Sequence, residues 1–361
     1  MMILVNGGSS SGKSAFAESL IVKEDKKERQ KIQETGEERG CPPSWYLATM
    51  IAWDEECRER IRKHRMMRAE KNFMTLECPV DIGSAEVPEN SRVLLECLSN
   101  LAANEMYRED LSSPEEGARE RILEGIRKIR EKSGLLVIVT NDVSGDHGPY
   151  SEETECYRRL LGDINGSLAA EADEVYEVFC GIPVKRKGIC REETSHMGDK
   201  IQNMDKNTEG ITLFTGGAYQ GKTKLALSEA ARKKEDHFIC AADGTESPVE
   251  HAFSSEAVLN LHMYIKRMID EVWEETADSG RSGMEELLEK RMYRFLDELL
   301  QKNPSAVITC DELGCGIVPV AKQDRLWREM TGDACQYLAE HAKKVCHVTC
   351  GLADVLKGGE S

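Results

Sequence analysis

Two glycine-rich segments of this chain have the residue types and the spacing of a phosphate-binding loop. They are NGGSSSGKS at residues 6–14 and TGGAYQGKT at residues 215–223, and both fit the pattern G-x-x-x-x-G-K-[ST]. Glycines in such a loop let backbone N–H groups turn inward around phosphate oxygens, and the helix that follows adds the positive end of its dipole. We therefore predict that both loops bind the phosphates of a nucleotide.

The lysine and the hydroxyl residue of each loop have separate expected roles. Lysine reaches the outer phosphates, and serine or threonine holds Mg²⁺. The predicted nucleotide-binding residues are Gly7, Gly8, Ser9, Ser10, Ser11, Gly12, Lys13 and Ser14 in the first loop, and Gly216, Gly217, Gly221, Lys222 and Thr223 in the second. Ser14 and Thr223 are also predicted metal ligands. The alternative for the second loop is one that keeps its turn geometry and binds nothing.

Two carboxylates follow predicted strands in the first half of the chain. Glu96 ends the apolar run in VLLECLSN. Asp142 lies in VTNDV, which follows another apolar run. Mg²⁺ at a nucleotide site takes one or two carboxylates besides phosphate oxygens. We predict both as metal ligands, and Glu96 also as a nucleotide contact. A helix cap or an inert surface pair is the alternative for each.

The segment DEECRERIRKHRMMRAEKNFMTLE concentrates basic residues in an otherwise acidic protein, with His64 among them. A solvated basic helix face would explain the pattern without any function. The alternative is a helix that holds phosphates beside an imidazole, with Arg62 and Arg65 as nucleotide contacts. Surrounding cations disfavour the imidazolium, so a neutral His64 is available as a nucleophile. We predict His64 and Lys13 as the catalytic residues.

The chain is a tandem duplication. The two loops match at an offset of 209 residues, whereas VTNDV and everything after it match the second half at an offset of 170. The second copy has therefore lost a net 39 residues between its loop and its later strands, in the region where His64 lies in the first copy. We predict a first domain at residues 1–185, a polar linker at 186–209 and a shortened second domain at 210–361.

Short apolar strands alternate with helical patterns in both copies. Such alternation predicts the α/β class, with a mostly parallel sheet and helices on both of its faces. Phosphate loops sit at the carboxyl ends of strands in folds of this type.

The overall composition excludes several classes of protein. The formal net charge of −17 argues against binding to nucleic acid or to an anionic membrane. No apolar run approaches the roughly 18 residues of a membrane span, and no signal peptide is recognisable. The thirteen cysteines contain no C-x-x-C pair and indicate free thiols. We expect a cytoplasmic protein with small-molecule substrates and no structural metal.

The segments MILVNGGSSSGKS, YLAT, DEECRERIRKHR, LLECLSN, VTNDV and AAEADEVYEVFCGIPVK follow one another in the first copy. In this order they resemble the bifunctional adenosylcobinamide kinase/adenosylcobinamide-phosphate guanylyltransferase family of cobalamin biosynthesis, over nearly all of residues 2–187. The resemblance implies a RecA-like P-loop fold and an enzyme that is often trimeric. It also implies two reactions: phosphorylation of adenosylcobinamide by ATP or GTP, and transfer of GMP from GTP through a guanylyl-histidine. That histidine falls on His64.

The second copy departs from this pattern because it has no basic R-I-x-x-H segment. His251 and His262 do not reproduce the motif, and the helical pattern around His262 favours a packed or capping residue. Its segment DELGCGIVP, in contrast, is closer to the family than NDVSGDHGPY of the first copy. We expect the first copy to carry the chemistry and the second to keep nucleotide contacts. A P-loop kinase for another small molecule and a regulatory nucleotide-binding protein without turnover are the alternatives. The two copies could pair with each other or form a homo-oligomer.

Overall fold

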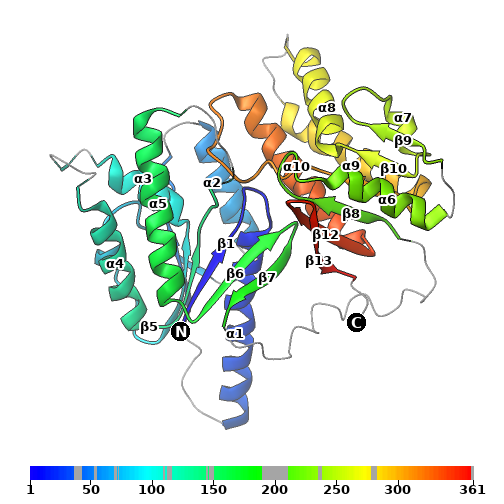
Figure 1. Cartoon of the computed structure of the whole chain (residues 1–361). Coiled ribbons are helices and arrows are strands. Elements are labelled where there is room, and N and C mark those ends of the chain that lie inside the picture. The colour runs from blue at the N-terminus through cyan, green and yellow to red at the C-terminus, as the bar shows by residue number, and fades with distance from the viewer. Residues whose placement is uncertain are drawn as a thin grey trace. The chain divides into compact units, whose positions relative to one another are not determined.

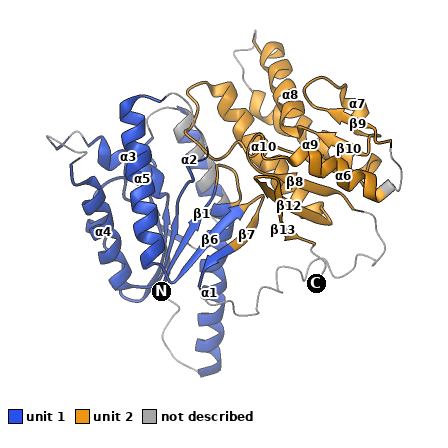
Figure 2. Ribbon diagram, viewed as in Figure 1, with its two compact units in different colours: residues 1–7, 13–178, 185–189 blue, residues 8–12, 179–184, 190–361 orange. Residues whose placement is uncertain are grey.

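The computed structural model describes residues 1–35, 43–52, 55–68, 71, 73–108, 110–111, 116–143, 145, 150–188, 210–234, 238–277 and 283–358. Contacts divide the chain into two compact units (Figure 2). Unit 1 contains residues 1–7, 13–178 and 185–189, and unit 2 contains residues 8–12, 179–184 and 190–361. Two separate sheets account for the strands, which agrees with a duplicated α/β fold.

The seven-stranded sheet contains the strand that precedes the first phosphate loop. Its strands in spatial order are β3 (Phe73–Glu77), β2 (Ser44–Ala48), β4 (Ser91–Glu96), β5 (Ser133–Val139), β1 (Met2–Asn6), β6 (Glu174–Phe179) and β7 (Ile182–Lys187). All neighbouring pairs from β3 to β6 are parallel. The strand before the loop, β1, therefore lies between β5 and β6, and its carboxyl end meets that of β5 at one edge of the sheet.

Helices cover both faces of this sheet (Figure 1). They are α1 (Lys13–Thr35), α3 (Leu98–Met106), α4 (Ala118–Lys132) and α5 (Glu152–Glu171). A further helix, α2 (Glu55–Arg68), follows β2 in the chain and buries none of its described side chains. Ile3 and Val5 of β1 pack with Ile21 of α1, whereas Met2 and Leu4 pack with α3, α4 and α5. Each such buried side chain contributes about 1.5–3 kcal/mol to the free energy of unfolding. Burial on both faces explains why the strands are continuous apolar runs.

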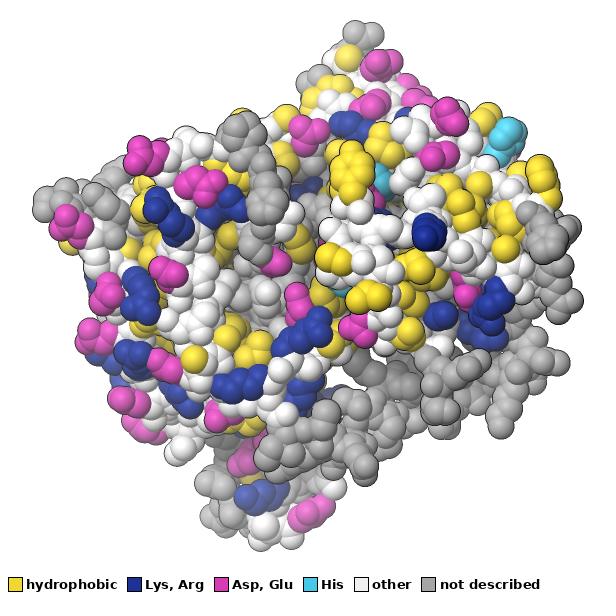
Figure 3. All heavy atoms as spheres, viewed as in Figure 1, with side chains coloured by type: hydrophobic (Ala, Val, Ile, Leu, Met, Phe, Trp, Pro, Cys, Tyr) yellow, Lys and Arg dark blue, Asp and Glu magenta, His cyan; other side chains and the backbone are white. Residues whose placement is uncertain are grey.

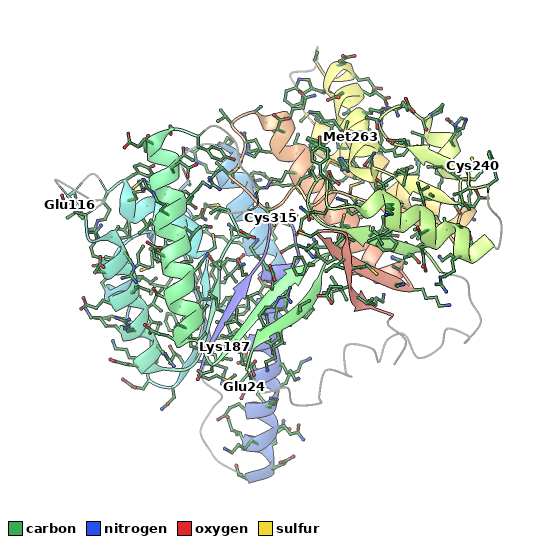
Figure 4. The ribbon with its side chains drawn as sticks, viewed as in Figure 1. Glu24, Glu116, Lys187, Cys240, Met263 and Cys315 are labelled. Atoms are coloured by element: carbon green, nitrogen blue, oxygen red, sulfur yellow. The ribbon has the colours of Figure 1, made fainter. Side chains whose placement is uncertain are left out.

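The charged segment 23–40 continues α1 as far as Thr35. Its side chains are mostly exposed, and Glu24 is labelled on this distal part of the helix in Figure 4. The segment is thus a solvated helix extension up to residue 35; residues 36–42 lie outside the described residues. On the face shown in Figure 3, basic and acidic side chains are interspersed.

The six-stranded sheet of unit 2 repeats the order of the first sheet without its terminal strand. Its strands in spatial order are β13 (Leu352–Lys357), β12 (Lys344–Thr349), β8 (Thr212–Thr215), β11 (Val307–Thr309), β10 (Ala257–Leu259) and β9 (Ala241–Asp243). The pairs are parallel except β12 with β13. Thus β8 corresponds to β1, β11 to β5, β10 to β4 and β9 to β2.

The helices of unit 2 are α6 (Lys222–Lys234), α7 (Val249–Ala252), α8 (Leu261–Glu275), α9 (Met284–Lys302) and α10 (Lys322–His341). The short α7 is the helix that the structure describes between β9 and β10. Unit 1 has α2, β3 and the 3₁₀ turn Ile82–Ser84 in the equivalent interval. Most of the missing residues of the second copy therefore correspond to these elements, which include the basic helix of the first copy. The first helix is shorter too, since α6 has 13 residues where α1 has 23.

The last strand of the first copy overlaps the segment assigned to the linker. Strand β7 ends at Lys187, so residues 186 and 187 belong to the sheet. Residues 189–209 lie outside the described residues, and the remaining linker boundary stays a prediction. Among the described helices, none combines the length and the hydropathy that a membrane crossing requires.

Replacing Gly125 with alanine is expected to destabilise unit 1. Gly125 of α4 packs directly on the 3₁₀ turn, where a Cβ atom would lie 2.6 Å from Ile82 Cγ2 and 2.8 Å from the Gly83 nitrogen. Such overpacking lowers the free energy of unfolding by about 1–3 kcal/mol. Gly162→Ala on α5 is the matched control, because a Cβ atom there meets nothing within 4 Å. Urea unfolding should show a lower midpoint only for Gly125→Ala; equal midpoints would contradict the packing described.

Candidate functional site

The first phosphate loop connects β1 to α1, and the helix begins at Lys13. Ser10 and Gly12 have the positive φ angles of 52° and 89° that turn the backbone back on itself. The Ser11 amide donates to the Gly8 carbonyl at 3.3 Å, and the Ser11 carbonyl accepts from the Gly181 amide at 2.7 Å. Lys13 is nearly buried, 8% exposed. The loop therefore has a compact conformation at the N-terminus of a helix.

The second loop repeats this conformation at the residues that lead into the helix, although Gly216 has a positive φ of 135° that its equivalent Gly7 lacks. Tyr219 and Gly221, the equivalents of Ser10 and Gly12, have φ angles of 60° and 92°, and α6 begins at Lys222. The Gly351 amide donates to the Gln220 carbonyl at 2.8 Å, as Gly181 does in the first copy. The part of the loop next to the helix therefore has the same backbone conformation in both copies.

The strand next to each loop strand ends in a matching hydrogen bond. The Asp142 amide donates to the Gly7 carbonyl at 3.1 Å, and the Glu312 amide donates to the Gly216 carbonyl at 3.0 Å. This places Asp142 and Glu312 at equivalent positions beside the first glycine of each loop. It also makes the preceding residues, Asn141 and Asp311, equivalent.

Unit 1 carries unpartnered oxygens at the ends of two strands. Glu96 Oε2 at the end of β4 and Asn6 Oδ1 at the end of β1 are buried and find no hydrogen-bond partner among the described residues. Buried acceptors without a donor fit a hard divalent cation, which takes oxygen ligands. The charges of Glu96 and Lys13 both act on the buried Cys97 thiol, whose pKa is raised by its burial. Glu96 and Lys13 therefore both lie close enough to Cys97 to influence its thiol.

A polar network lies behind this site in the first copy. Ser99 Oγ is 3.0 Å from Cys97 Sγ and accepts a hydrogen bond from Asn141 Nδ2 at 2.6 Å. The Ser99 carbonyl accepts from the Tyr157 hydroxyl at 3.2 Å. The bond to Ser99 holds the uncharged side chain of Asn141 in place, two residues beyond the end of β5.

The second copy has a charged cluster at the same place. Asp311 Oδ1 lies 2.7 Å from Lys222 Nζ, which also donates to the Gly217 carbonyl at 2.6 Å. The Asp311 amide donates to His262 Nδ1 at 3.1 Å, so the imidazole proton is on Nε2, 3.8 Å from Asp311 Oδ2. Burial lowers the pKa of His262 although Asp311 acts in the opposite direction. As its helical pattern suggests, His262 is packed, 7% exposed at the start of α8.

One arginine of each copy holds the loop that follows this strand end. Arg328 of α10 donates to the Ile317 carbonyl at 2.9 Å, to the Gly316 carbonyl at 3.0 Å and to the Gly314 carbonyl. Its equivalent at the offset of 170, Arg158 of α5, donates to the Val143 carbonyl at 3.2 Å. Cys315 of the second copy is labelled on this loop in Figure 4. Sequence analysis missed both arginines, although the repeat register contains them.

The basic helix α2 exposes two of its predicted nucleotide contacts. Arg62 pairs with Glu59 and Arg65 pairs with Glu77, and these side chains are exposed. His64 lies on α2, but its side chain is outside what the structure describes. The predicted roles of Arg62, Arg65 and His64 therefore stay predictions. Among the described residues, no three His, Cys, Asp or Glu side chains form a metal cluster.

Comparison with known proteins agrees with this architecture. The family model for cobinamide kinase / cobinamide phosphate guanyltransferase matches residues 3–186 and 255–356, which together exceed half of the chain. The chain belongs to this family. The second matched segment begins just before β10, after the interval in which the second copy is short. The second phosphate loop lies outside the matched segments, so its assignment depends on its own motif and conformation.

Curated relatives match along their whole length but cover only half of this chain. The bifunctional adenosylcobalamin biosynthesis protein CobU of Salmonella typhimurium is 31% identical over 199 residues, which is 100% of that protein and 52% of this chain. CobU of Escherichia coli shows the same identity and coverage. The corresponding protein CobP of Pseudomonas aeruginosa is 28% identical over 191 residues, 98% of its length. About half of the chain is thus additional to the length of these relatives.

Proposed function

We propose that this chain phosphorylates adenosylcobinamide with a nucleoside triphosphate and then transfers GMP from GTP to adenosylcobinamide phosphate. Membership of the cobinamide kinase family supports the substrate class. The observation that carries the proposal is the first loop, which leads into a helix N-terminus with the nearly buried Lys13. Glu96 at the end of β4 adds a buried oxygen without a hydrogen-bond partner. Predicted nucleotide contacts are the residues of both loops together with Arg62, Arg65 and Glu96.

In the kinase reaction, the substrate hydroxyl oxygen bonds to the γ-phosphorus while the bond to the β,γ-bridging oxygen breaks. The hydroxyl proton is released, and the nucleoside diphosphate leaves. Backbone amides of the first loop and Lys13 hold the phosphates and offset the charge that grows on the leaving oxygen. Ser14, Glu96 and Asp142 are the side chains that would hold Mg²⁺, with Thr223 in the second loop. Bound there, the ion would neutralise phosphate charge.

In the transferase reaction, a neutral imidazole nitrogen of His64 bonds to the α-phosphorus of GTP, and pyrophosphate leaves. The imidazole gives up its remaining proton in forming the guanylyl-histidine. A phosphate oxygen of adenosylcobinamide phosphate then bonds to the same phosphorus, the P–N bond breaks and His64 regains a proton. The step requires a neutral imidazole, because the protonated ring has no free nitrogen lone pair.

The test is conversion of adenosylcobinamide by the purified chain in the presence of Mg²⁺ with GTP, and separately with ATP. We expect adenosylcobinamide phosphate in the mass spectrum first and adenosylcobinamide-GDP afterwards, the second product only where GTP is present. Formation of adenosylcobinamide phosphate without adenosylcobinamide-GDP would show that the chain has the kinase activity only. A chain that binds GTP and forms neither product would be a regulatory nucleotide-binding protein, against the proposal.

A further inference from the structure

The two copies differ by one charge at a strand end that touches the phosphate loop. Asn141 follows β5 and Asp311 follows β11, and the hydrogen bonds of the next residues to Gly7 and Gly216 make the positions equivalent. In each copy this strand is the direct neighbour of the strand that leads into the loop. The residue at this position is therefore close to where the phosphates of a bound nucleotide would lie.

The second copy uses this carboxylate to hold its own loop lysine. The ion pair of Lys222 with Asp311 is largely shielded from water, with side-chain exposures of 6% and 19%. The backbone amide of Asp311 is bonded to His262, which fixes the end of the strand. Asn141 of the first copy instead donates its side-chain amide to Ser99 and carries no charge. Lys222 of the second loop is thus paired with the carboxylate of Asp311, whereas the equivalent residue of the first copy, Asn141, is uncharged.

A triphosphate that enters the second loop must take Lys222 from this acid. The carboxylate would then face phosphate oxygens of the same charge across a short, poorly hydrated distance, where repulsion is little screened. A divalent cation between the two groups reverses the sign of this interaction, because carboxylate and phosphate oxygens both coordinate it. An amide at the same position imposes no such repulsion.

We propose that Asp311 makes nucleotide binding at the second loop conditional on Mg²⁺, so that this loop is filled only by the metal complex of the nucleotide. The inference depends on the proposed function of the second loop as a nucleotide site. Mg²⁺ and nucleotide then bind cooperatively there, with the coupling supplied by one side chain. The reciprocal change, Asn141→Asp, transfers this requirement to the first loop.

The test uses full-length chain in which Lys13→Ala disables the first loop. Binding of guanosine 5′-(β,γ-imido)triphosphate is measured by calorimetry in MgCl₂ and in EDTA. We expect the affinity to fall about tenfold or more without the metal, within the usual range of coupling between two sites. Adding Asp311→Asn should raise the affinity in EDTA and lower it in MgCl₂. This change of opposite sign is a result that a merely structural effect would not produce.

Glu286→Gln is the matched control, since it removes one carboxylate charge of unit 2 in an exposed residue of α9 that pairs with Lys290. It should leave most of the metal dependence in place. The Asn141→Asp variant in a Lys222→Ala background should gain metal dependence. If Lys13→Ala protein binds the probe equally in both buffers, or if Asp311→Asn changes both affinities in the same direction, the inference is wrong while the nucleotide site stands. If that protein binds no probe in either buffer, the second loop is not a nucleotide site and both ideas fail.

Discussion

Replacing Lys13 with alanine is expected to lower the rate of adenosylcobinamide phosphorylation by about 10²- to 10³-fold, the usual loss when one charge-stabilising group of an active site is removed. Lys13 is the first residue of α1 and nearly buried at the phosphate loop, so no other side chain of that loop can supply a positive charge there. The loss should appear in both KM and kcat, because Lys13 holds the phosphates of the bound nucleotide and also offsets the charge that the departing nucleoside diphosphate gains in the transition state.

Lys222→Ala is the matched control for this experiment. It is the same substitution at the first residue of α6, after a loop whose Tyr219 and Gly221 have φ angles close to those of Ser10 and Gly12. The second copy has no counterpart of the His64 helix between β9 and β10. We therefore expect Lys222→Ala to lower the rate of product formation by less than about tenfold. Steady-state assays of both variants decide the matter. A large loss for Lys222→Ala with a small loss for Lys13→Ala would place the chemistry in the second copy.

Replacing His64 with alanine is expected to abolish covalent labelling of the chain by α-labelled GTP. The guanylyl group needs a nucleophilic nitrogen, and alanine offers none. The label on the unaltered chain should be acid-labile and base-stable, as a phosphoramidate is. Phosphorylation of adenosylcobinamide should continue in His64→Ala, because the first loop is unchanged. Denaturing electrophoresis after incubation with GTP and Mg²⁺ measures the label.

His251→Ala serves as the matched control for the label. His251 is an exposed histidine of the second copy, on α7 in the interval that corresponds to the basic helix. The label should persist in this variant. If His64→Ala protein takes the label and His251→Ala protein does not, the nucleophile is His251 of the second copy and the prediction is wrong.

The largest surprise of the structure is the acid that engages Lys222. Asp311 is 89 residues further along the chain, and the sequence pattern pointed to Glu96 and Asp142 as metal ligands but not to Asp311. The repeat register already aligned Asn141 with Asp311. Its meaning depends on the pairing of β11 with β8, which brings the two side chains to 2.7 Å.

Sequence alone determined the two phosphate loops, their conformation at the start of a helix, the α/β class and the register of the duplication. These features depend on neighbouring residues: glycine permits the positive φ angles, and apolar runs of strand length become buried strands. The resemblance carried by the motifs led to the family that the comparison shows. The net loss of 39 residues also located the missing basic helix correctly, because the two offsets bracket it.

Only the tertiary structure decided which distant side chains meet. The order of strands follows from burying both faces of each sheet under helices, and no local pattern reports that order. The tertiary structure also leaves one oxygen of Glu96 without a hydrogen-bond partner among the described residues. It lets Arg158 and Arg328 donate to backbone carbonyls that follow equivalent strands. It pairs Arg62 and Arg65 with nearby carboxylates. Backbone conformation at a glycine-rich turn is a local property of the chain, whereas the charge that faces a loop lysine is a property of the assembled sheet.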